Sequence, residues 1–324
     1  MARGIGSYLR KMNKLLILVP VVLVLLHYIT RKKYEVNKTG IVLITGASTG
    51  IGRHAAEHIA SNHDYLVLAG VRKESDADSI RQLGVKNLQP IIIDVASHDS
   101  VVRAVDEIKG LVSTKSLPFV GLVNNAGVSR KVIAEFHAVD DAKAVFDTNF
   151  FGVLDLVQQT LPLLRASKGR IINISSVAGF LVVPKFGVYS ASKYALEALS
   201  DAIRRETAHF GISVSVVEPA FVKSAIHQAS RIASSKVVSE TDEQKEMLTL
   251  YGQFLTQAKA DKHSEELKTA DGPIVTSVAI EDALVSSYPQ TRYAVARASG
   301  LHASVIRWVA WLLSDRLADI VLME

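Results

Sequence analysis

From residue 41 onward, short apolar runs rich in β-branched residues alternate with longer segments that have the apolar period of a helix. The first pattern is typical of strands and the second of amphipathic helices. Several of the short runs are apolar at every position, so we expect both faces of their sheet to be buried. This alternation predicts an α/β fold with a doubly wound parallel sheet. The expected strands are residues 41–45, 65–69, 88–93, 119–123, 170–174, 213–217 and 292–295.

A separate uncharged apolar run occupies residues 15–29, with basic residues on both sides of it. About 20 apolar residues span a bilayer as a helix, and flanking residues that snorkel can lengthen a short run. We therefore expect a single-pass N-terminal transmembrane helix, kinked at Pro20. The alternatives are a cleaved signal peptide, for which no small-residue cleavage site follows, and a buried core helix. The orientation stays open, and the sequon at Asn37 matters only if the domain faces a lumen.

The composition narrows the range of functions. Of the 324 residues, 48% are hydrophobic and 21% are charged, which suits one large domain with extensions. The formal net charge of +5 is mild and no basic stripe is interleaved with aromatic residues, so we expect no nucleic-acid partner. The lack of cysteine excludes disulfides and thiol catalysis. His54 and His58 share a helix face without an evident third ligand, so we predict no metal site.

The first expected strand runs directly into the glycine-rich turn T-G-A-S-T-G-I-G at residues 45–52, and a helix pattern follows. Glycine lets a backbone turn tightly and approach a pyrophosphate closely, and the amide groups at a helix N-terminus attract the anion. A glycine-rich loop alone is a weak signal. Its place between a strand and a helix is the context that dinucleotide binding requires.

Tyr189 and Lys193 are four residues apart and would share one face of a helix. A free tyrosine has a pKa of about 10, which is too high for a base near neutral pH. We expect the nearby ammonium to favour the phenolate and to lower that pKa. Such a pair can give a proton to a carbonyl oxygen or take one from an alcohol. Ser176, at the end of an expected strand, offers a hydroxyl that would stabilise charge on a substrate oxygen.

Taken together, these motifs resemble those of the short-chain dehydrogenase/reductase family, as does N-N-A-G at residues 124–127. The resemblance covers about residues 39–293, and the motifs are jointly specific. By family spacing it implies that Ser176, rather than Ser175, acts with Tyr189 and Lys193. It also implies an active-site Asn149, thought in the family to hold a water that connects the lysine to solvent. The lysine is further implied to hold the nicotinamide ribose.

The resemblance implies a nicotinamide cofactor held at the ends of several strands. The implied cofactor-binding residues are Thr45, Gly46, Ser48, Thr49, Gly50, Ile51, Gly52, Arg72, Asp94, Val95, Asn124, Ala126, Gly127, Tyr189, Lys193, Pro219, Val222 and Ser224. The segment after the sixth strand departs from the family pattern, because Ala220 replaces a glycine and Ser224 a threonine. Ser224 keeps a hydroxyl that can contact the cofactor. The replacement of the glycine by Ala220 leaves the path of the backbone near the nicotinamide open.

Cofactor preference is usually set at the end of the second strand, where an acidic residue would bind the ribose hydroxyls of NAD(H). This sequence has no acidic residue there and carries Arg72 instead. A guanidinium can bind a 2′-phosphate through paired, charge-assisted hydrogen bonds, so we predict NADP(H). A solvated turn residue is the alternative reading of Arg72, and Thr49 stands where some NADP-dependent relatives carry a second basic residue.

The expected organisation is an anchor and flank at 1–38, a single Rossmann-type catalytic domain at 39–298 and a C-terminal amphipathic helix at 299–324. A substrate-side insertion at 222–275 interrupts the catalytic domain, unless its charged helical part is only a solvated surface helix. The apolar stripe of the C-terminal helix suits a membrane surface near the substrate entrance. Packing on the protein or on a second subunit is the alternative.

The stretch at 195–206 resembles the branch of the family that holds retinol, 17β-hydroxysteroid and 3-hydroxybutyrate dehydrogenases. Together with the two membrane-directed segments, it predicts a membrane-bound oxidoreductase for a lipophilic alcohol or carbonyl compound, such as a retinoid, steroid or long-chain ketone. Membrane lipid and the endoplasmic reticulum are the expected surroundings, and family members are often homodimers or homotetramers. Two alternatives are an NAD-dependent dehydrogenase of a small hydroxy acid such as 3-hydroxybutyrate, and a non-catalytic NADP(H)-binding scaffold or sensor.

Overall fold

The computed structural model describes residues 22, 29–223, 246, 249–252 and 270–323. The chain divides into two compact units, Met1–Tyr34 and Glu35–Glu324. The expected transmembrane run at 15–29 lies almost wholly outside the described residues, as does most of the insertion at 222–275. Within the described part, no helix combines the length and the apolar character needed to cross a bilayer.

Seven parallel strands form the main sheet, in the order β3-β2-β1-β4-β5-β6-β7. Five of them are buried at every position, as their continuous apolar runs predict. All seven expected strands are confirmed, with small shifts at their ends. They are β1 (Gly40–Ile44), β2 (Tyr65–Val71), β3 (Leu88–Ile92), β4 (Phe119–Asn124), β5 (Arg170–Ile174), β6 (Ser213–Pro219) and β7 (Arg292–Val295).

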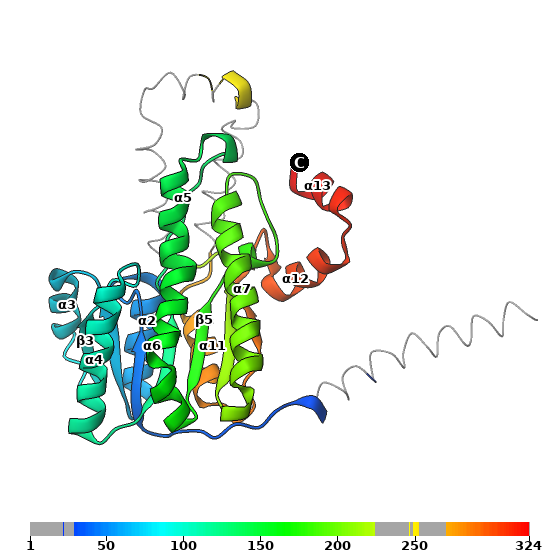
Figure 1. Ribbon diagram of the computed structural model, residues 1–324. Coiled ribbons are helices and arrows are strands. Elements are labelled where there is room, and N and C mark those ends of the chain that lie inside the picture. Colours follow the sequence, from blue (N-terminus) through cyan, green and yellow to red (C-terminus); the bar gives the residue numbers. More distant parts are fainter. Residues whose placement is uncertain (1–21, 23–28, 224–245, 247–248, 253–269, 324) are drawn as a thin grey trace, which may run out of the picture. The chain divides into compact units, whose positions relative to one another are not determined.

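Helices cover both faces of the sheet, which confirms the Rossmann-type doubly wound architecture (Figure 1). The apolar stripes of α2 (Gly50–Asn62), α3 (Glu74–Arg81) and α11 (Ile274–Val285) pack on one face. The other face is covered by α4 (His98–Lys115), α6 (Gly152–Ser167) and α7 (Gly187–Thr207). Each face therefore has its own buried apolar core.

Shorter helical elements connect the strands and the main helices. The helix α5 (Val139–Phe146) continues through the π-helical turn η2 (Asp147–Phe151) into α6. Three short 3-10 turns are η1 (Ala134–Phe136), η3 (Val177–Gly179) and η4 (Ala208–Phe210). The chain leaves β1 to build β2 and β3 on one side, then returns to β4 on the other. This reversal creates the crevice where open α/β sheets bind their ligands.

After β7, a small hairpin of β8 (Arg297–Ala298) and β9 (Leu301–His302) leads into the C-terminal segment. The segment forms two helices, α12 (Ala303–Leu312) and α13 (Asp315–Met323), where the sequence predicts one. The break is at Leu313, whose backbone is extended with a ψ of 133°. The backbone carbonyl oxygen of Ser314 then starts α13 by accepting hydrogen bonds from the N–H groups of Leu317 and Ala318.

Candidate active site

The glycine-rich turn joins β1 to α2 through a backbone that only glycine fits. Gly46 and Gly50 have φ values of +65° and +60°, in the left-handed region. A Cβ atom on Gly46 would lie 2.8 Å from the Cα of Ala126, and one on Gly52 would lie 2.3 Å from the Nδ2 of Asn125. The turn is therefore pressed against the chain that follows β4, as a close-fitting pyrophosphate cradle requires.

The N-terminus of α2 is free to receive an anion. Its N-cap residue, Thr49, makes no capping hydrogen bond through its side chain, and the first turn contains no acidic residue. Uncapped amide groups and the helix dipole give this end a partial positive charge. The residues of the turn therefore fit a nucleotide phosphate, the group for which the sequence predicts them.

The side chains of Thr45 and Asn125 hold the glycine-rich turn against the chain that follows β4. The Oγ1 of Thr45, which is buried, accepts hydrogen bonds from the backbone N–H groups of Asn125 and Ala126, both at 3.0 Å. The Nδ2 of Asn125 donates to the carbonyl oxygens of Thr45 at 2.8 Å and Gly46 at 3.2 Å. Asn125 is missing from the predicted site, although the second asparagine of N-N-A-G was a signal that could have identified it.

Its neighbour Asn124 turns the other way, into the sheet. Its Nδ2 donates to the Oδ1 of Asn173 at 2.8 Å, and the Nδ2 of Asn173 donates to the Oγ of Ser200 at 2.8 Å. This chain of buried amides ties β4 to β5 and α7. The side chain of Asn124 is thus bonded within the sheet, and its part in binding a cofactor stays a prediction.

The predicted adenosine-side residues follow β2 and β3, which are neighbours in the sheet. Arg72 is exposed directly after β2, and no other described residue forms an ion pair or hydrogen bond with its guanidinium. Asp94 is fixed after β3, since its Oδ1 accepts from the backbone N–H of Ala96 and its own N–H donates to the Oγ of Ser100. The next residue, Val95, is buried. Arg72 thus has its donors available for an anion.

Ser176 and Tyr189 meet at the carboxyl edge of β5, close to the opposite wall of the crevice. Ser176 follows β5 and caps η3, with its Oγ accepting from the backbone N–H of Ala178 at 3.1 Å. Tyr189 lies in the first turn of α7. Burial raises the pKa of Tyr189, and its hydrogen bond with Ser176 opposes the rise. The prediction that the nearby ammonium lowers this pKa is therefore wrong, because the loss of solvent around the phenol raises it.

Lys193 lies one turn further along α7 and is buried. Its Nζ is 5.8 Å from the ring centroid of Tyr189 and donates to the carbonyl oxygen of Ile174 at 2.9 Å. Burial lowers the pKa of Lys193 to about 8, against the opposing charge of Glu197. The ammonium is thus held beside the phenol with a proton that it can release near neutral pH.

The π-helical turn η2 places Asn149 against this pair. Single π turns inside helices often occur at functional sites. The Nδ2 of Asn149 donates to the carbonyl oxygen of Val128 at 2.9 Å and to the Oγ of Ser192 at 3.0 Å. Its Oδ1 accepts from the backbone N–H of Val128 at 2.9 Å. A Cβ on Gly127 would lie 3.4 Å from that Oδ1 and 3.7 Å from the Nζ of Lys193, so the three residues are neighbours.

The last predicted residues follow β6. Pro219 ends the strand, and Val222 is buried and forms a bridge to Asp271. Ser224 lies outside the described residues. The segment is nevertheless anchored, because the backbone N–H of Lys223 donates to the carbonyl oxygen of Asp271 at 2.9 Å. Both ends of the insertion therefore lie beside the end of β6.

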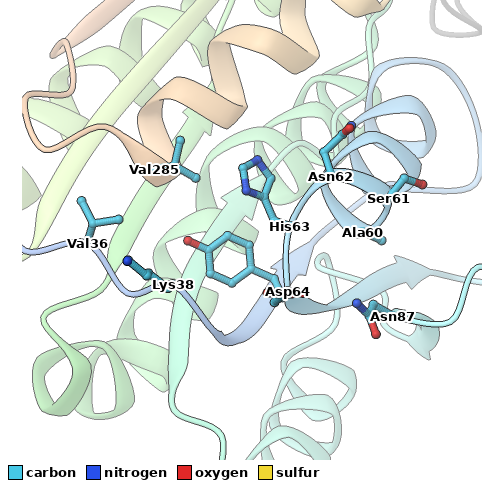
Figure 2. A pocket seen from close by; sticks show the side chains of 10 residues that line it. Val36, Lys38, Ala60, Ser61, Asn62, His63, Asp64, Asn87 and Val285 are labelled. Atoms are coloured by element: carbon cyan, nitrogen blue, oxygen red, sulfur yellow. The ribbon is translucent and has the colours of Figure 1, made fainter.

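A cavity of about 340 Å³ lies at the opposite, amino-terminal edge of the sheet (Figure 2). It is lined by polar side chains such as Lys38, Asn62 and His63, with Val36 and Val285 at one side. None of its lining residues is a predicted site residue, so it is separate from the active site. Nearby, His58 and His63 both contact the carboxylate of Glu281, at 2.8 and 2.6 Å. In the described part of the chain, no three His, Cys, Asp or Glu residues could hold a metal ion.

A parallel sheet of this order, with a phosphate cradle on one side of the crevice and a Ser–Tyr–Lys set on the other, defines a dinucleotide-dependent oxidoreductase. The family model described as short chain dehydrogenase matches residues 40–234. The chain belongs to the short-chain dehydrogenase family, as its motifs predict, and within it to the retinol and steroid dehydrogenase branch.

Three relatives are similar over most of their length. Human retinol dehydrogenase 16 is 34% identical over 78% of this chain and 79% of its own. Bovine 17-beta-hydroxysteroid dehydrogenase type 6 is 33% identical over the same shares. The NADPH-dependent 3-dehydrocapnine reductase of Ornithobacterium rhinotracheale is 32% identical over 86% of this chain and 94% of its own. An oxidoreductase that acts on alcohols follows from these relatives.

Solved structures agree with the fold. A short-chain dehydrogenase/reductase of Burkholderia phymatum, in complex with NAD, covers 89% of this chain and 96% of its own with a TM-score of 0.67 at 23% identity. A gluconate 5-dehydrogenase of Burkholderia cenocepacia, in complex with NADP and tartrate, covers 64% and 78% with a TM-score of 0.53 at 27% identity. Both cofactors therefore occur among the structural neighbours.

Proposed function

We propose that this protein is a membrane-bound, NADP(H)-dependent oxidoreductase that interconverts an alcohol and a carbonyl group on a lipophilic substrate such as a retinoid, a steroid or a long-chain ketone. The observation that carries the chemistry is the meeting of Ser176, Tyr189 and Lys193 at the carboxyl edge of the sheet. When bound, the nicotinamide would supply or take the hydride. The chain's own residues would handle the substrate oxygen and its proton.

In the direction of reduction, the hydroxyl of Ser176 holds the substrate oxygen and Tyr189 gives it a proton. Lys193 stands behind the phenol, where its charge stabilises the phenolate that proton transfer leaves. Asn149 ties the loop after β4 to α7 through Val128 and Ser192, next to the turn of α7 that carries Tyr189 and Lys193.

Two observations support NADP(H) and a lipophilic substrate. The guanidinium of Arg72 after β2, which has no partner among the described residues, suits a 2′-phosphate. One relative carries NADPH in its name, while others are named for retinol or hydroxysteroids.

The apolar run at 15–29 and the exposed apolar side chains of α12 support a location at a membrane, for which we propose the endoplasmic reticulum. We also propose that the protein forms a homodimer or homotetramer, as members of the family often do.

The test is steady-state turnover of the full chain in detergent, with NADPH and NADH compared across retinal, ketosteroids, long-chain ketones and acetoacetate. We expect NADPH-dependent reduction of a lipophilic carbonyl, lost in Tyr189→Phe. The exchange Arg72→Asp should lower kcat/KM for NADPH by roughly 10- to 100-fold, since hydrogen bonds to charged groups contribute about 1.5–3 kcal/mol. The exposed Arg103→Ala on α4 is the matched control.

Each alternative outcome has a distinct meaning. A preference for NADH with acetoacetate would indicate a dehydrogenase of a small hydroxy acid. Tight NADPH binding without turnover on any substrate, equal in wild type and Tyr189→Phe, would indicate a cofactor-binding scaffold.

A further inference from the structure

A cluster of two buried carboxylates and two partly exposed guanidinium groups lies behind the active site. It contains two carboxylates, Glu197 and Glu218, and two guanidinium groups, Arg292 and Arg307. The Nε of Arg292 is 3.1 Å from the Oε2 of Glu197 and 3.5 Å from the Oε1 of Glu218. Arg307 donates from its Nη1 to the same Oε1 of Glu218. The side chain of Glu218 is 0% exposed and that of Glu197 is 11% exposed.

Each of these residues belongs to a different element. Glu197 lies on α7, one turn after Lys193, and Glu218 is the residue before Pro219 at the end of β6. Arg292 begins β7, while Arg307 comes from α12, after the sheet is complete. The C-terminal segment thus contributes one of the two cations to a charge cluster under the active site.

The same arginine also contacts the turn that carries Ser176. Its Cζ lies 5.2 Å from the ring centroid of Phe180, the residue after η3. On the inner side of that turn, a Cβ on Gly179 would lie 3.1 Å from the Cγ of Glu197, so the turn packs tightly on the cluster. Arg307 therefore bridges two structures of the active site, the Ser176 turn and the end of β6.

Among the described residues, Arg292 and Arg307 are the cations that pair with the two buried carboxylates. Arg292 also contacts Asp201 at 3.0 Å, a carboxylate that Arg204 pairs with as well. In the part of the chain that the structure describes, the second carboxylate oxygens of Glu197 and Glu218 have no hydrogen-bond partner. Burial and Glu197 raise the pKa of Glu218 to about 7, against the opposing effects of Arg307 and Arg292. Loss of Arg307 would leave a buried carboxylate poorly compensated, a costly state that favours rearrangement.

We propose that Arg307 is a positioning residue of the active site, which holds the end of β6 and the Ser176 turn in place through Glu218 and Phe180. Catalysis then requires α12 to be docked. This inference rests on the proposed function as far as Ser176, Tyr189 and Lys193 perform the chemistry.

The test compares the full chain with Arg307→Met, Arg307→Lys, Glu218→Gln and the double variant Arg307→Met/Glu218→Gln. We expect Arg307→Met to lower kcat by roughly 10- to 100-fold with little change in KM, because small displacements of reacting groups cost that much. Arg307→Lys should restore much of the loss. The double variant should lose less than the two single losses combined, because it leaves no unpaired carboxylate. Arg316→Met on α13 is the matched control.

The pH profile separates this role from a general loss of structure. Glu197, Arg292 and Arg307 are the charged groups that face Glu218, so removing Arg307 raises the pKa of Glu218 further. The deficit of Arg307→Met should therefore be smallest near pH 6, where Glu218 is protonated, and should grow toward pH 8. Glu218→Gln should remove this pH dependence.

The chain offers an independent measure of docking. Its two tryptophans, Trp308 and Trp311, both lie on α12, so their emission anisotropy reports how firmly this helix is held. It should fall in Arg307→Met above pH 7 and recover in the double variant. An Arg307→Met protein with wild-type kcat at every pH, or a deficit that neither pH nor Glu218→Gln changes, would overturn the inference. An inactive wild type would instead refute the proposed function, and the inference with it.

Discussion

At the scale of single residues, burial rather than neighbouring charge dominates the chemistry of Tyr189 and Lys193. Each side chain loses solvent in the packed edge of the sheet, which raises the pKa of the phenol and lowers that of the ammonium to about 8. The two shifts move the proton affinities apart, since free tyrosine and lysine have similar pKa values of about 10. Near neutral pH the phenol therefore keeps a proton to give to a carbonyl oxygen, while the ammonium beside it stays largely charged.

The buried ammonium predicts a pH dependence of stability. Between pH 8 and about 10, Lys193 releases its proton in the folded chain but keeps it in the unfolded chain, where its pKa is about 10.4. The unfolded state then binds more protons, so the free energy of unfolding rises with pH across this window. We expect a contribution of roughly 1–3 kcal/mol, absent in Lys193→Met.

Urea unfolding of wild type, Lys193→Met and the exposed control Lys109→Met, at pH 7, 8, 9 and 10, would measure this difference. Between pH 8 and 10, the free energy of unfolding should rise by the same amount in wild type and in Lys109→Met, and this rise should be missing in Lys193→Met. If the free energy of unfolding changed with pH in the same way in all three proteins, burial would not destabilise the ammonium of Lys193, and the prediction would be wrong.

At the scale of elements, the cradle depends on how closely α2 approaches the chain after β4. A Cβ on Gly52 would lie 2.3 Å from the Nδ2 of Asn125 and 2.5 Å from the carbonyl oxygen of Gly46, so Gly52→Ala must displace the turn. We expect the exchange to cost about 1–3 kcal/mol of stability and to weaken NADPH binding. Gly110→Ala on α4, where nothing lies within 4 Å, should stabilise the chain by about 0.5–1 kcal/mol.

Chemical unfolding and NADPH fluorescence titration of the two variants check this prediction. The two alanines differ only in what the added methyl group meets. If both variants had the same stability and the same NADPH affinity, the turn would accommodate a methyl group at residue 52, which would contradict the prediction.

The strands and the principal active-site residues could be predicted from the sequence because both depend on local order along the chain. A continuous apolar run can only be buried on both faces, and a tyrosine four residues before a lysine shares its helix face. Contacts between distant segments could not be predicted in this way. Arg307 lies within the C-terminal helix that the sequence predicts as amphipathic, yet its side chain contacts Glu218, 89 residues away. The role of Asn125 likewise depends on the approach of α2.

At the scale of the whole molecule, the apolar surface of the C-terminal helices is unusual for a protein free in water. On α12, Trp308 is 64% exposed, Trp311 76% and Leu312 69%. Leu317 and Ile320 continue this exposed apolar character on α13. Apolar surface of this kind, with tryptophan prominent, is typical of helices that lie in a membrane interface. The same α12 that carries these side chains outward also reaches Glu218 through Arg307, so the proposed contact with lipid and the proposed positioning of the active site would meet on one helix.

This arrangement predicts that the double exchange Trp308→Glu/Trp311→Glu affects only substrate that is delivered from a bilayer. With retinal or a ketosteroid dissolved in phospholipid vesicles, KM should rise by roughly tenfold or more, since each buried aromatic side chain contributes about 1.5–3 kcal/mol. With the same substrate dispersed in detergent, kcat and KM should stay close to wild type, because both tryptophan side chains are largely exposed. Leu83→Glu, a comparable exchange at an exposed leucine after α3, controls for added negative charge. An equal rise of KM in vesicles and in detergent would place the tryptophans in the substrate's own path, and unchanged KM in both would remove α12 from any role at the membrane.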